Sequence, residues 1–217
     1  MTGIFKIEQY SNFFFDFDGT IIDNQRYHDR SLDQVFRKRG IQLSDFGSEK
    51  IKGLTTPDIV EFLNSKHGYN FDKNEIQTEK TEIYNSIFRP NPVRGIKEFT
   101  GKLKEKGAGV FMVTSAPKYY IDKYLRIINI TLFTEENTIS GDMVSKRKPD
   151  PEIYMLALRK FGIQKKASIL VFEDSLLGVQ SAVKAGLNCA GVLTSAKEKS
   201  LLEKGALFTI NDFTIFR

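Results

Sequence analysis

Two aspartates lie close together near the start of the chain, in the segment DFDGT at residues 16–20, directly after the apolar run Phe13-Phe14-Phe15. Two carboxylates at the end of a buried strand repel one another, so a cation or a shared proton must relieve the repulsion. Divalent cations that prefer oxygen ligands are natural partners, and Gly19 permits a tight turn away from the strand. The segment alone is also compatible with an ordinary acidic turn.

Two further polar pairs follow apolar runs. Glu173-Asp174 comes after residues 168–172, and Thr114-Ser115 comes after residues 110–113. Each pair alone has a simpler interpretation, because acids favour helix N-termini and hydroxyls cap helices. At the end of a strand, however, the hydroxyls and backbone N–H groups of Thr114-Ser115 could hold phosphate oxygens.

Lys148 stands directly before Pro149-Asp150-Pro151, a sequence typical of the start of a helix. A lone lysine at such a position is most often exposed to solvent.

Strands and helices alternate around these residues. Apolar runs predict strands at 13–15, 110–113, 168–172, 189–193 and, more weakly, 206–210, and apolar periodicity predicts helices at 93–106, 153–161 and 175–185. This alternation predicts an α/β fold with a parallel sheet. Because such sheets bind ligands at the carboxyl ends of their strands, the polar residues should converge there.

The segment 22–91 has helical periodicity, as at Leu32, Val35 and Phe36, and no clear strand. It returns through Pro90-Asn91-Pro92, where prolines disfavour helix and mark a linker. We therefore assign residues 1–21 and 92–217 to the α/β core and residues 22–91 to an inserted helical domain.

Composition excludes several classes of protein. Lys and Arg total 32 against 27 Asp and Glu, a net charge of +5, but the charges are mixed along the chain, and no nucleic-acid-binding motif is present. No apolar run approaches the roughly 20 residues of a membrane helix, and the first residues do not resemble a secretory signal. The single cysteine, Cys189, cannot form an internal disulfide, so we expect a cytoplasmic protein.

In this order and spacing, the four polar segments closely resemble the motifs of the haloacid dehalogenase superfamily. DFDGT at 16–20 is similar to the first motif, Thr114 to the second, Lys148 to the third and Glu173-Asp174 to the fourth. RKPDP at 147–151 and VFEDSLLGV at 171–179 resemble the subgroup of phosphoglycolate phosphatases, sugar-phosphate phosphatases and β-phosphoglucomutase. The resemblance implies a Rossmann-like parallel-sheet core with an inserted small α-helical cap of the C1 type.

The resemblance also implies a chemistry, that of a Mg²⁺-dependent phosphatase acting on a small phosphomonoester such as a sugar phosphate or phosphoglycolate. Asp16 would be the nucleophile that forms an aspartyl-phosphate, and Asp18 would be the general acid and then the general base. Lys148 would neutralise charge, and Thr114 would donate a hydrogen bond to the phosphoryl group. The implied magnesium ligands are Asp16, Asp18 (also through its main-chain carbonyl), Asp174 and, directly or one shell further out, Glu173.

Further residues are implied to contact the substrate. The backbone at Phe17, Gly19 and Ser115 would surround the phosphate, and His28, Lys52 and Thr56 would contact the substrate from the cap. A helical histidine is also commonly just structural. Thr56 stands where β-phosphoglucomutase has an arginine that anchors a second phosphate, which disfavours mutase activity unless Lys52, Lys118 or a cap lysine substitutes.

Three functions stay open on the sequence, with the phosphatase ahead of a β-phosphoglucomutase-type phosphomutase and a non-catalytic phosphate-binding protein. Asp18 argues against dehalogenation, because the dehalogenases of the superfamily lack this second aspartate. The acidic pair of a phospho-acceptor receiver domain would precede its acceptor aspartate, whereas Glu173-Asp174 follows Asp16. We expect a small phosphorylated metabolite as the partner, with no nucleic acid and no membrane, and a monomer, with a dimer as the alternative.

Overall fold

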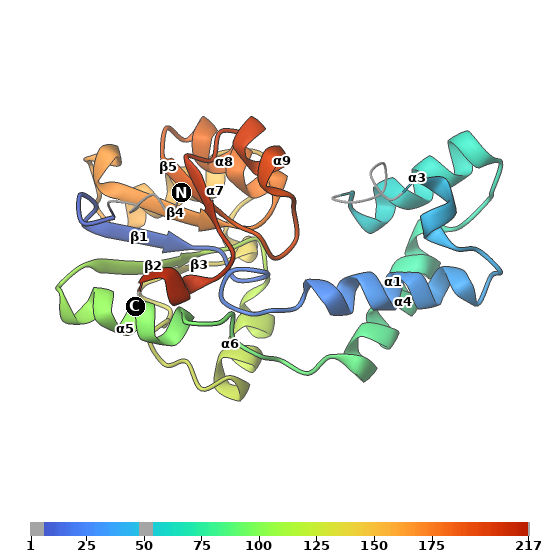
Figure 1. Cartoon of the computed structure of the whole chain (residues 1–217), viewed down its shortest axis with the longest axis horizontal. Helices are drawn as coiled ribbons and strands as arrows, with labels where there is room; N and C mark the ends of the chain where they lie inside the picture. The colour runs from blue at the N-terminus through green and yellow to red at the C-terminus, as the bar shows by residue number, and fades with distance from the viewer. Residues whose placement is uncertain (1–6, 48–53, 217) are drawn as a thin grey trace. The chain divides into compact units, whose positions relative to one another are not determined.

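The structure is a computed structural model that describes residues 7–47 and 54–216. Backbone contacts divide the chain into two compact units, Met1–Asp23 with Pro90–Arg217 and Asn24–Arg89. The first unit contains the sheet and the second is built from helices (Figure 1). The junctions lie two residues inside the segment 22–91 that the sequence assigns to the insert.

The first unit has a six-stranded sheet in the order β3-β2-β1-β4-β5-β6, and every neighbouring pair is parallel. This confirms the predicted parallel α/β fold. The strands are continuous apolar runs because both faces of the sheet are covered by other elements. They are β1 (Asn12–Phe15), β2 (Gly109–Val113), β3 (Thr138–Ile139), β4 (Ile169–Glu173), β5 (Asn188–Val192) and β6 (Phe208–Ile210).

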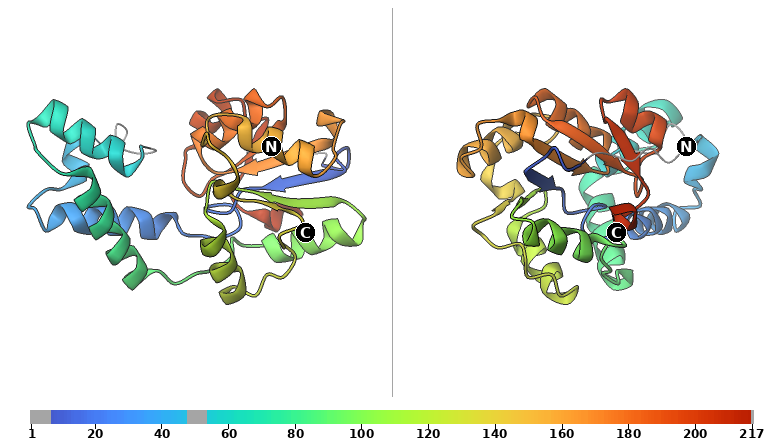
Figure 2. Two further views of the ribbon diagram at one scale, coloured as in Figure 1. Left: turned by 180° about the vertical axis from the view of Figure 1, so that it is seen from behind. Right: turned by 60° about the vertical axis from the view of Figure 1, so that its left-hand side comes forward.

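Helices cover both faces of the sheet (Figures 1 and 2). On one face, Phe14 packs in a core with side chains of α7, α8 and α9. On the other face, Phe13 and Phe15 meet Phe99 of α5 edge to face at 6.2 and 6.1 Å. The helices of this unit are α5 (Ile96–Glu105), α6 (Lys118–Ile127), α7 (Glu152–Lys160), α8 (Leu176–Lys184) and α9 (Glu198–Glu203).

Three of these elements, β3, α6 and α9, are not predicted by the apolar pattern. β3 has two residues and α9 has six, so neither is long enough to show a periodicity. In α6 the buried residues Ile121, Tyr124 and Leu125 alternate with charged residues and with the exposed Tyr119, and the preceding Pro117 supplies the start. The position of α6 is relevant to the site, because only Ala116 and Pro117 separate Thr114-Ser115 from its first residue, Lys118.

In the second unit, the described residues 24–47 and 54–89 form α1 (Gln25–Arg37), the short 3-10 helix η1 (Leu43–Phe46), α3 (Thr56–His67) and α4 (Lys73–Ile87). Thr55 and Asp58 form a capping box at the start of α3, and Gly68 ends that helix in the left-handed conformation. The unit has its own apolar core, made of Leu32, Val35, Phe36, Ile41, Ile59, Val60, Leu63 and Ile76.

The two chain segments that join the units run side by side. The N–H of Asp23 donates to the carbonyl of Asn91 at 2.9 Å, and the N–H of Val93 donates to the carbonyl of Ile21 at 2.9 Å. Within residues 7–47 and 54–216, no helix has the length and apolar character that crossing a membrane requires.

Candidate active site

Strand register brings the acidic residues to one level of the sheet. Phe15, the last residue of β1, pairs with Met112 in β2 and with Phe172 in β4. The N–H of Asp16 continues this ladder by donating to the carbonyl of Phe172 at 3.1 Å. Asp16 and Glu173 therefore extend from the carboxyl ends of two adjacent strands, the edge where parallel sheets bind ligands.

Lys148 joins these carboxylates. Its Nζ donates to Asp16 Oδ1 at 2.6 Å, to Glu173 Oε1 at 2.5 Å and to the carbonyl of Val113 at 3.1 Å. The side chain of Lys148 is only 6% exposed. Burial alone would lower the pKa of the ammonium group, but the two carboxylates outweigh burial and raise it, so Lys148 stays charged.

The loop that carries Lys148 is fixed by the first turn of α7. The carboxylate of Glu152 accepts hydrogen bonds from the backbone N–H groups of Ser145 and Lys146 at 3.0 and 2.8 Å. The hydroxyl of Ser181 in α8 donates to the carbonyl of Asp150 at 2.6 Å. These bonds hold both sides of Lys148, so its side chain is presented to the sheet edge in one position.

Asp16, Glu173 and Asp174 form a buried acidic cluster in which each offers a carboxylate oxygen within 4.8 Å of the others. Burial, opposed by Lys148, raises the pKa of Glu173 to about 7. Burial and the neighbouring charges of Asp16 and Glu173 raise the pKa of Asp174 well above its usual range. Burial is the larger cause of both shifts, and one lysine does not balance the charge of three carboxylates. A hard divalent cation would complete the balance, and this all-oxygen donor set fits Mg²⁺.

Two glycines allow the close packing of the cluster. A Cβ on Gly19 would overlap the carboxylate of Asp174, and φ of Gly19 is +70°, in the left-handed region that favours glycine. A Cβ on Gly178 in α8 would overlap the carboxylate of Glu173. The N–H of Gly19 donates to the carbonyl of Ile22 at 2.8 Å, so this group is already engaged within the loop.

The other predicted residues of the first two motifs lie around this cluster. Phe17 and Thr20 are fully buried, and Asp18 is half-buried and is not among the three clustered carboxylates. Thr114 is buried at the end of β2, where its Oγ1 accepts a hydrogen bond from the N–H of Ala116 at 3.1 Å. Its own O–H can still donate. Ser115 follows it and is half-buried.

Four residues outside the predicted site also contribute, and of these the sequence indicates only Thr194, at the end of the apolar run 189–193. The hydroxyl of Tyr154 donates to Glu173 Oε1 at 2.5 Å, and that of Tyr120 donates to Asp18 Oδ1 at 3.3 Å. Thr194 donates to the carbonyl of Gly19 at 2.6 Å and Ser195 to that of Asp174 at 2.7 Å. Thr194 and Ser195 follow β5, and the same pattern of a polar residue after an apolar run that indicates Thr194 extends to Ser195. The two tyrosines lie in helices among apolar residues and give no such signal.

The helical unit contains a separate polar cluster. The ring of His28 stacks on Tyr84 with a centroid distance of 4.3 Å, and Asn24 Nδ2 lies 3.4 Å from His28 Nε2. Burial, and then the charge of Lys80, lower the pKa of His28 to about 3. Lys80 donates to Thr56 Oγ1 at 2.8 Å and was not predicted from the sequence. Lys52 lies outside the described residues, as does Gly53 of the predicted specificity loop.

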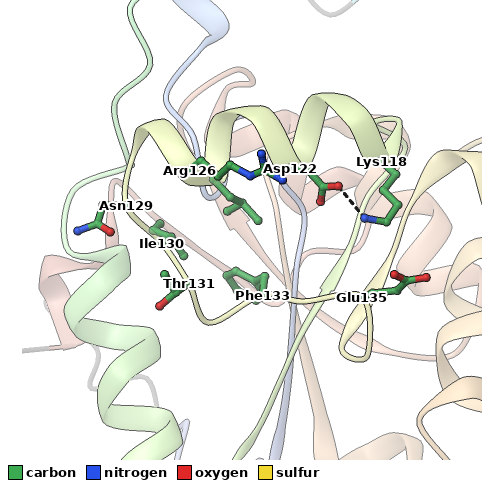
Figure 3. Close-up of a pocket in the computed structure, with 9 residues that line it drawn as sticks. Lys118, Asp122, Arg126, Asn129, Ile130, Thr131, Phe133 and Glu135 are labelled. Atoms are coloured by element: carbon green, nitrogen blue, oxygen red, sulfur yellow. Dashed lines mark hydrogen bonds and ion pairs between the residues drawn. The ribbon is translucent and has the colours of Figure 1, made fainter.

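A hollow of about 380 Å³ lies in the first unit between α6 and the segment that follows it (Figure 3). It is lined by Lys118, Asp122, Leu125, Arg126, Asn129, Ile130, Thr131, Phe133 and Glu135. None of the clustered carboxylates, nor Lys148, contributes to this lining. The hollow is therefore separate from the candidate active site.

Residues 13–192 match the haloacid dehalogenase-like hydrolase family, and the chain belongs to that family. The match spans both the first and the fourth of the motifs described above. It confirms the resemblance inferred from the sequence and identifies the protein as a hydrolase.

Known proteins are similar over nearly the whole chain. A phosphorylated carbohydrates phosphatase of Thermotoga maritima is 29% identical over 199 residues, covering 89% of this chain and 90% of the relative. A protein of Bacteroides vulgatus described as a candidate β-phosphoglucomutase is 26% identical with a TM-score of 0.75, covering 95% of this chain and 86% of that one. A haloacid dehalogenase-like protein of Agrobacterium tumefaciens has the same fold, with a TM-score of 0.84 at 18% identity and coverage of 95% and 96%.

Proposed function

We propose that this protein is a Mg²⁺-dependent phosphatase that hydrolyses a small organic phosphomonoester through an aspartyl-phosphate on Asp16. The observation that carries the proposal is the buried lysine between two carboxylates: Lys148 contacts both Asp16 and Glu173 at the carboxyl end of the sheet. A nucleophilic carboxylate needs a nearby cation before a phosphate dianion can approach it. The family membership and the named phosphatase among the relatives support the same chemistry.

In the first step, a carboxylate oxygen of Asp16 attacks phosphorus, and the bond between phosphorus and the ester oxygen breaks. Asp18 gives its proton to the departing alkoxide. In the second step, a water attacks the phosphorus of the aspartyl-phosphate and gives a proton to Asp18, which releases inorganic phosphate and restores Asp16. We propose that Lys148, Thr114 and the N–H groups of Phe17 and Ser115 hold the phosphoryl oxygens. Gly19 contributes to the same loop because it lets the backbone pass close to the carboxylate of Asp174.

Mg²⁺ would be held by Asp16, Asp174 and the main-chain carbonyl of Asp18, with Glu173 directly beside it or one shell further out. When bound, the cation supplies charge that lets the anionic substrate approach the anionic nucleophile. The crowding of buried carboxylates supports this role. Burial, and then the repulsion between the carboxylates, raise the pKa of Glu173 and of Asp174, and a cation would favour their charged forms.

We propose that the helical unit is the cap that selects the substrate. His28, Thr56 and Lys80 of this unit are the described candidates for substrate contact, and Lys52 is a further candidate outside the described residues. Hydroxyl and ammonium groups suit the hydroxyl-rich body of a sugar phosphate, the class of substrate named for the Thermotoga maritima relative. We therefore infer the substrate class, a sugar phosphate, from this relative, and we propose that residues of the cap determine which sugar phosphate is bound.

One observation favours a second function, that of a phosphomutase. Thr56 replaces the arginine that a β-phosphoglucomutase uses for its second phosphate, but Lys80 Nζ lies 2.8 Å from Thr56 Oγ1 and puts a cation at that position. β-Glucose 1-phosphate with a glucose bisphosphate primer separates the two functions. Glucose 6-phosphate as the main product supports a mutase, and inorganic phosphate as the main product supports the phosphatase.

A phosphate-release screen over a panel of phosphorylated metabolites tests the phosphatase directly. We expect turnover of at least one sugar phosphate with Mg²⁺, none after chelation, and none by a folded Asp16→Asn variant. Equal phosphate release by wild type and Asp16→Asn would contradict the role of Asp16. No release from any ester by the Mg²⁺-loaded wild type would instead support a non-catalytic phosphate-binding protein.

A further inference from the structure

Asp18 stands apart from the clustered carboxylates and is bonded to a tyrosine of a different element. The hydroxyl of Tyr120, in the first turn of α6, donates to Asp18 Oδ1 at 3.3 Å. Asp18 is the residue that must deliver a proton to the leaving group, so whatever orients its carboxylate also affects that step.

We propose that Tyr120 is a positioning residue that orients Asp18 for proton transfer. The proposal rests on the phosphatase function above, in which Asp18 is the general acid. The hydrogen bond from the Tyr120 hydroxyl restrains the rotation of the Asp18 carboxyl group, which gives its proton to the ester oxygen as the phosphorus–oxygen bond breaks. Tyr120 keeps its own proton throughout and therefore acts through Asp18.

The ring of Tyr120 is held in place on two sides. It meets the ring of Phe17 edge to face at 5.9 Å and that of Tyr124 at 4.6 Å. Phe17 is the fully buried residue between the two aspartates of the first motif. The aromatic contact and the hydrogen bond therefore join Tyr120 to two successive residues of that motif, which a surface tyrosine would not do.

The start of α6 is itself anchored to the core. The N–H of Lys118 donates to Asp142 Oδ2 at 2.7 Å, and the N–H of Gly141 donates to the carbonyl of Ala116 at 2.9 Å. Thr114 and Ser115, the proposed phosphate contacts, precede this anchor in the same loop. One short segment thus fixes both the phosphate-binding residues and the hydroxyl that holds the general acid.

Tyr120→Phe removes only the hydroxyl and keeps both ring contacts. The matched control is Tyr119→Phe, the same change one residue earlier on a side chain that is 75% exposed. The readout is kcat/KM, which reports the steps up to cleavage of the ester bond, measured with two esters. p-Nitrophenyl phosphate has a leaving group that needs no proton, whereas an alkyl ester, the best sugar phosphate from the screen, does.

We expect Tyr120→Phe to lower kcat/KM about tenfold for the sugar phosphate and to leave it within about twofold of wild type for p-nitrophenyl phosphate, since general acid catalysis acts on poor leaving groups. Tyr119→Phe should match wild type with both esters. An equal loss of kcat/KM with both esters would show a merely structural role for Tyr120. No loss with either ester would show that Asp18 does not need the hydrogen bond from Tyr120. Either result overturns the proposal while the phosphatase function stands. A wild type that hydrolyses neither ester overturns both.

Discussion

The ammonium group of Lys148 lies between two carboxylates that would otherwise face each other without compensation. It forms short, charge-assisted hydrogen bonds to Asp16 at 2.6 Å and to Glu173 at 2.5 Å, and both are buried. Removing one partner from such a set leaves the remaining charges buried and unpaired, which costs more than an exposed ion pair is worth. Lys148 should therefore matter for stability as well as for turnover.

Replacing Lys148 by Met should abolish phosphate release and lower the free energy of unfolding by about 3 kcal/mol in chelated protein. Lys146→Met is the matched control, because Lys146 is in the same loop, its side chain is 71% exposed, and its ion pair with Asp150 is 3.9 Å long. Urea unfolding and a phosphate assay measure the two effects. A Lys148→Met protein as stable and as active as Lys146→Met would contradict the role given to Lys148.

At the residue scale, the sequence predicts the charged residues of the site and misses their hydrogen-bonding neighbours. The sequence marks the end of a strand as an apolar run that stops at a polar residue, and this pattern indicates Asp16 and Asp174. Lys148 is indicated by the helix-start sequence that follows it. Tyr120 and Tyr154 contact the site from the faces of helices. Such contacts depend on how a helix is rotated against the sheet, which local pattern does not specify.

At the element scale, α8 begins at Leu176, directly after the site residues Glu173 and Asp174 and the N-cap Ser175. Its Gly178 faces the carboxylate of Glu173 so closely that a Cβ would overlap it, although φ of this residue is an ordinary helical one. A glycine within a helix normally costs about 1 kcal/mol relative to alanine. The close approach of α8 to β4 is thus obtained at the expense of helix propensity.

Gly178→Ala should therefore destabilise the protein and lower its turnover, against the normal trend for this substitution. Gly101→Ala in α5 is the matched control, because a Cβ there meets nothing within 4 Å. We expect Gly101→Ala to raise the free energy of unfolding by up to about 1 kcal/mol. Thermal unfolding of both variants measures these changes in stability. A stabilised, fully active Gly178→Ala protein would show that α8 does not pack closely against Glu173.

The packing of α1 against α4 makes the helical unit sensitive to acid. His28 of α1 stacks on Tyr84 of α4 and lies near Lys80, and its pKa is lowered from 6.5 to about 3. Between these values the unfolded chain takes up a proton at His28 and the folded protein does not. This contribution to stability is therefore complete above pH 6.5 and is lost as the pH falls towards 3.

His28→Phe keeps an aromatic ring beside Tyr84 and cannot take up the proton. We expect its free energy of unfolding to fall less steeply than that of wild type between pH 6.5 and pH 4, by up to about 1.4 kcal/mol per pH unit. Parallel slopes for wild type and His28→Phe in denaturant titrations at several pH values would rule out this contribution.

The sequence predicts the elements of the first unit except β3, α6 and α9. β1, β2, β4 and β5 are buried on both sides and appear as apolar runs, while the two residues of β3 pair only with β2. The helices within residues 24–89 show apolar periodicity in the sequence. The residues that begin and end them, such as the capping box at Thr55, do not indicate which helices pack together. Long-range packing decides these features, and the local pattern does not record it.

At the scale of the whole molecule, the chain contains two units with separate apolar cores. Two antiparallel connections next to each other join them, with Asp23 bonded to Asn91 and Val93 bonded to Ile21. A core defect in one unit should therefore loosen that unit first, because each unit has an apolar core of its own.

Leu63→Ala tests this independence, since Leu63 is fully buried in the core of the helical unit. We expect a loss of about 2–5 kcal/mol and faster amide hydrogen exchange in α1, α3 and α4, with exchange in β1, β2 and β4 unchanged. Leu54→Ala, at a side chain that is 40% exposed, is the control and should leave exchange unchanged throughout. Faster exchange in the strands as well would mean that the two units unfold as one.

The most direct test of the proposed function is to capture the covalent intermediate. Protein mixed with the best substrate of the screen and Mg²⁺ is quenched in acid and treated with borohydride, which reduces an acyl-phosphate to an alcohol. Peptide mass spectrometry should then find homoserine in place of aspartate at residue 16, and only when substrate was present. Homoserine at another acidic residue, or unmodified Asp16 under conditions where phosphate is released in a burst, would contradict the aspartyl-phosphate on Asp16.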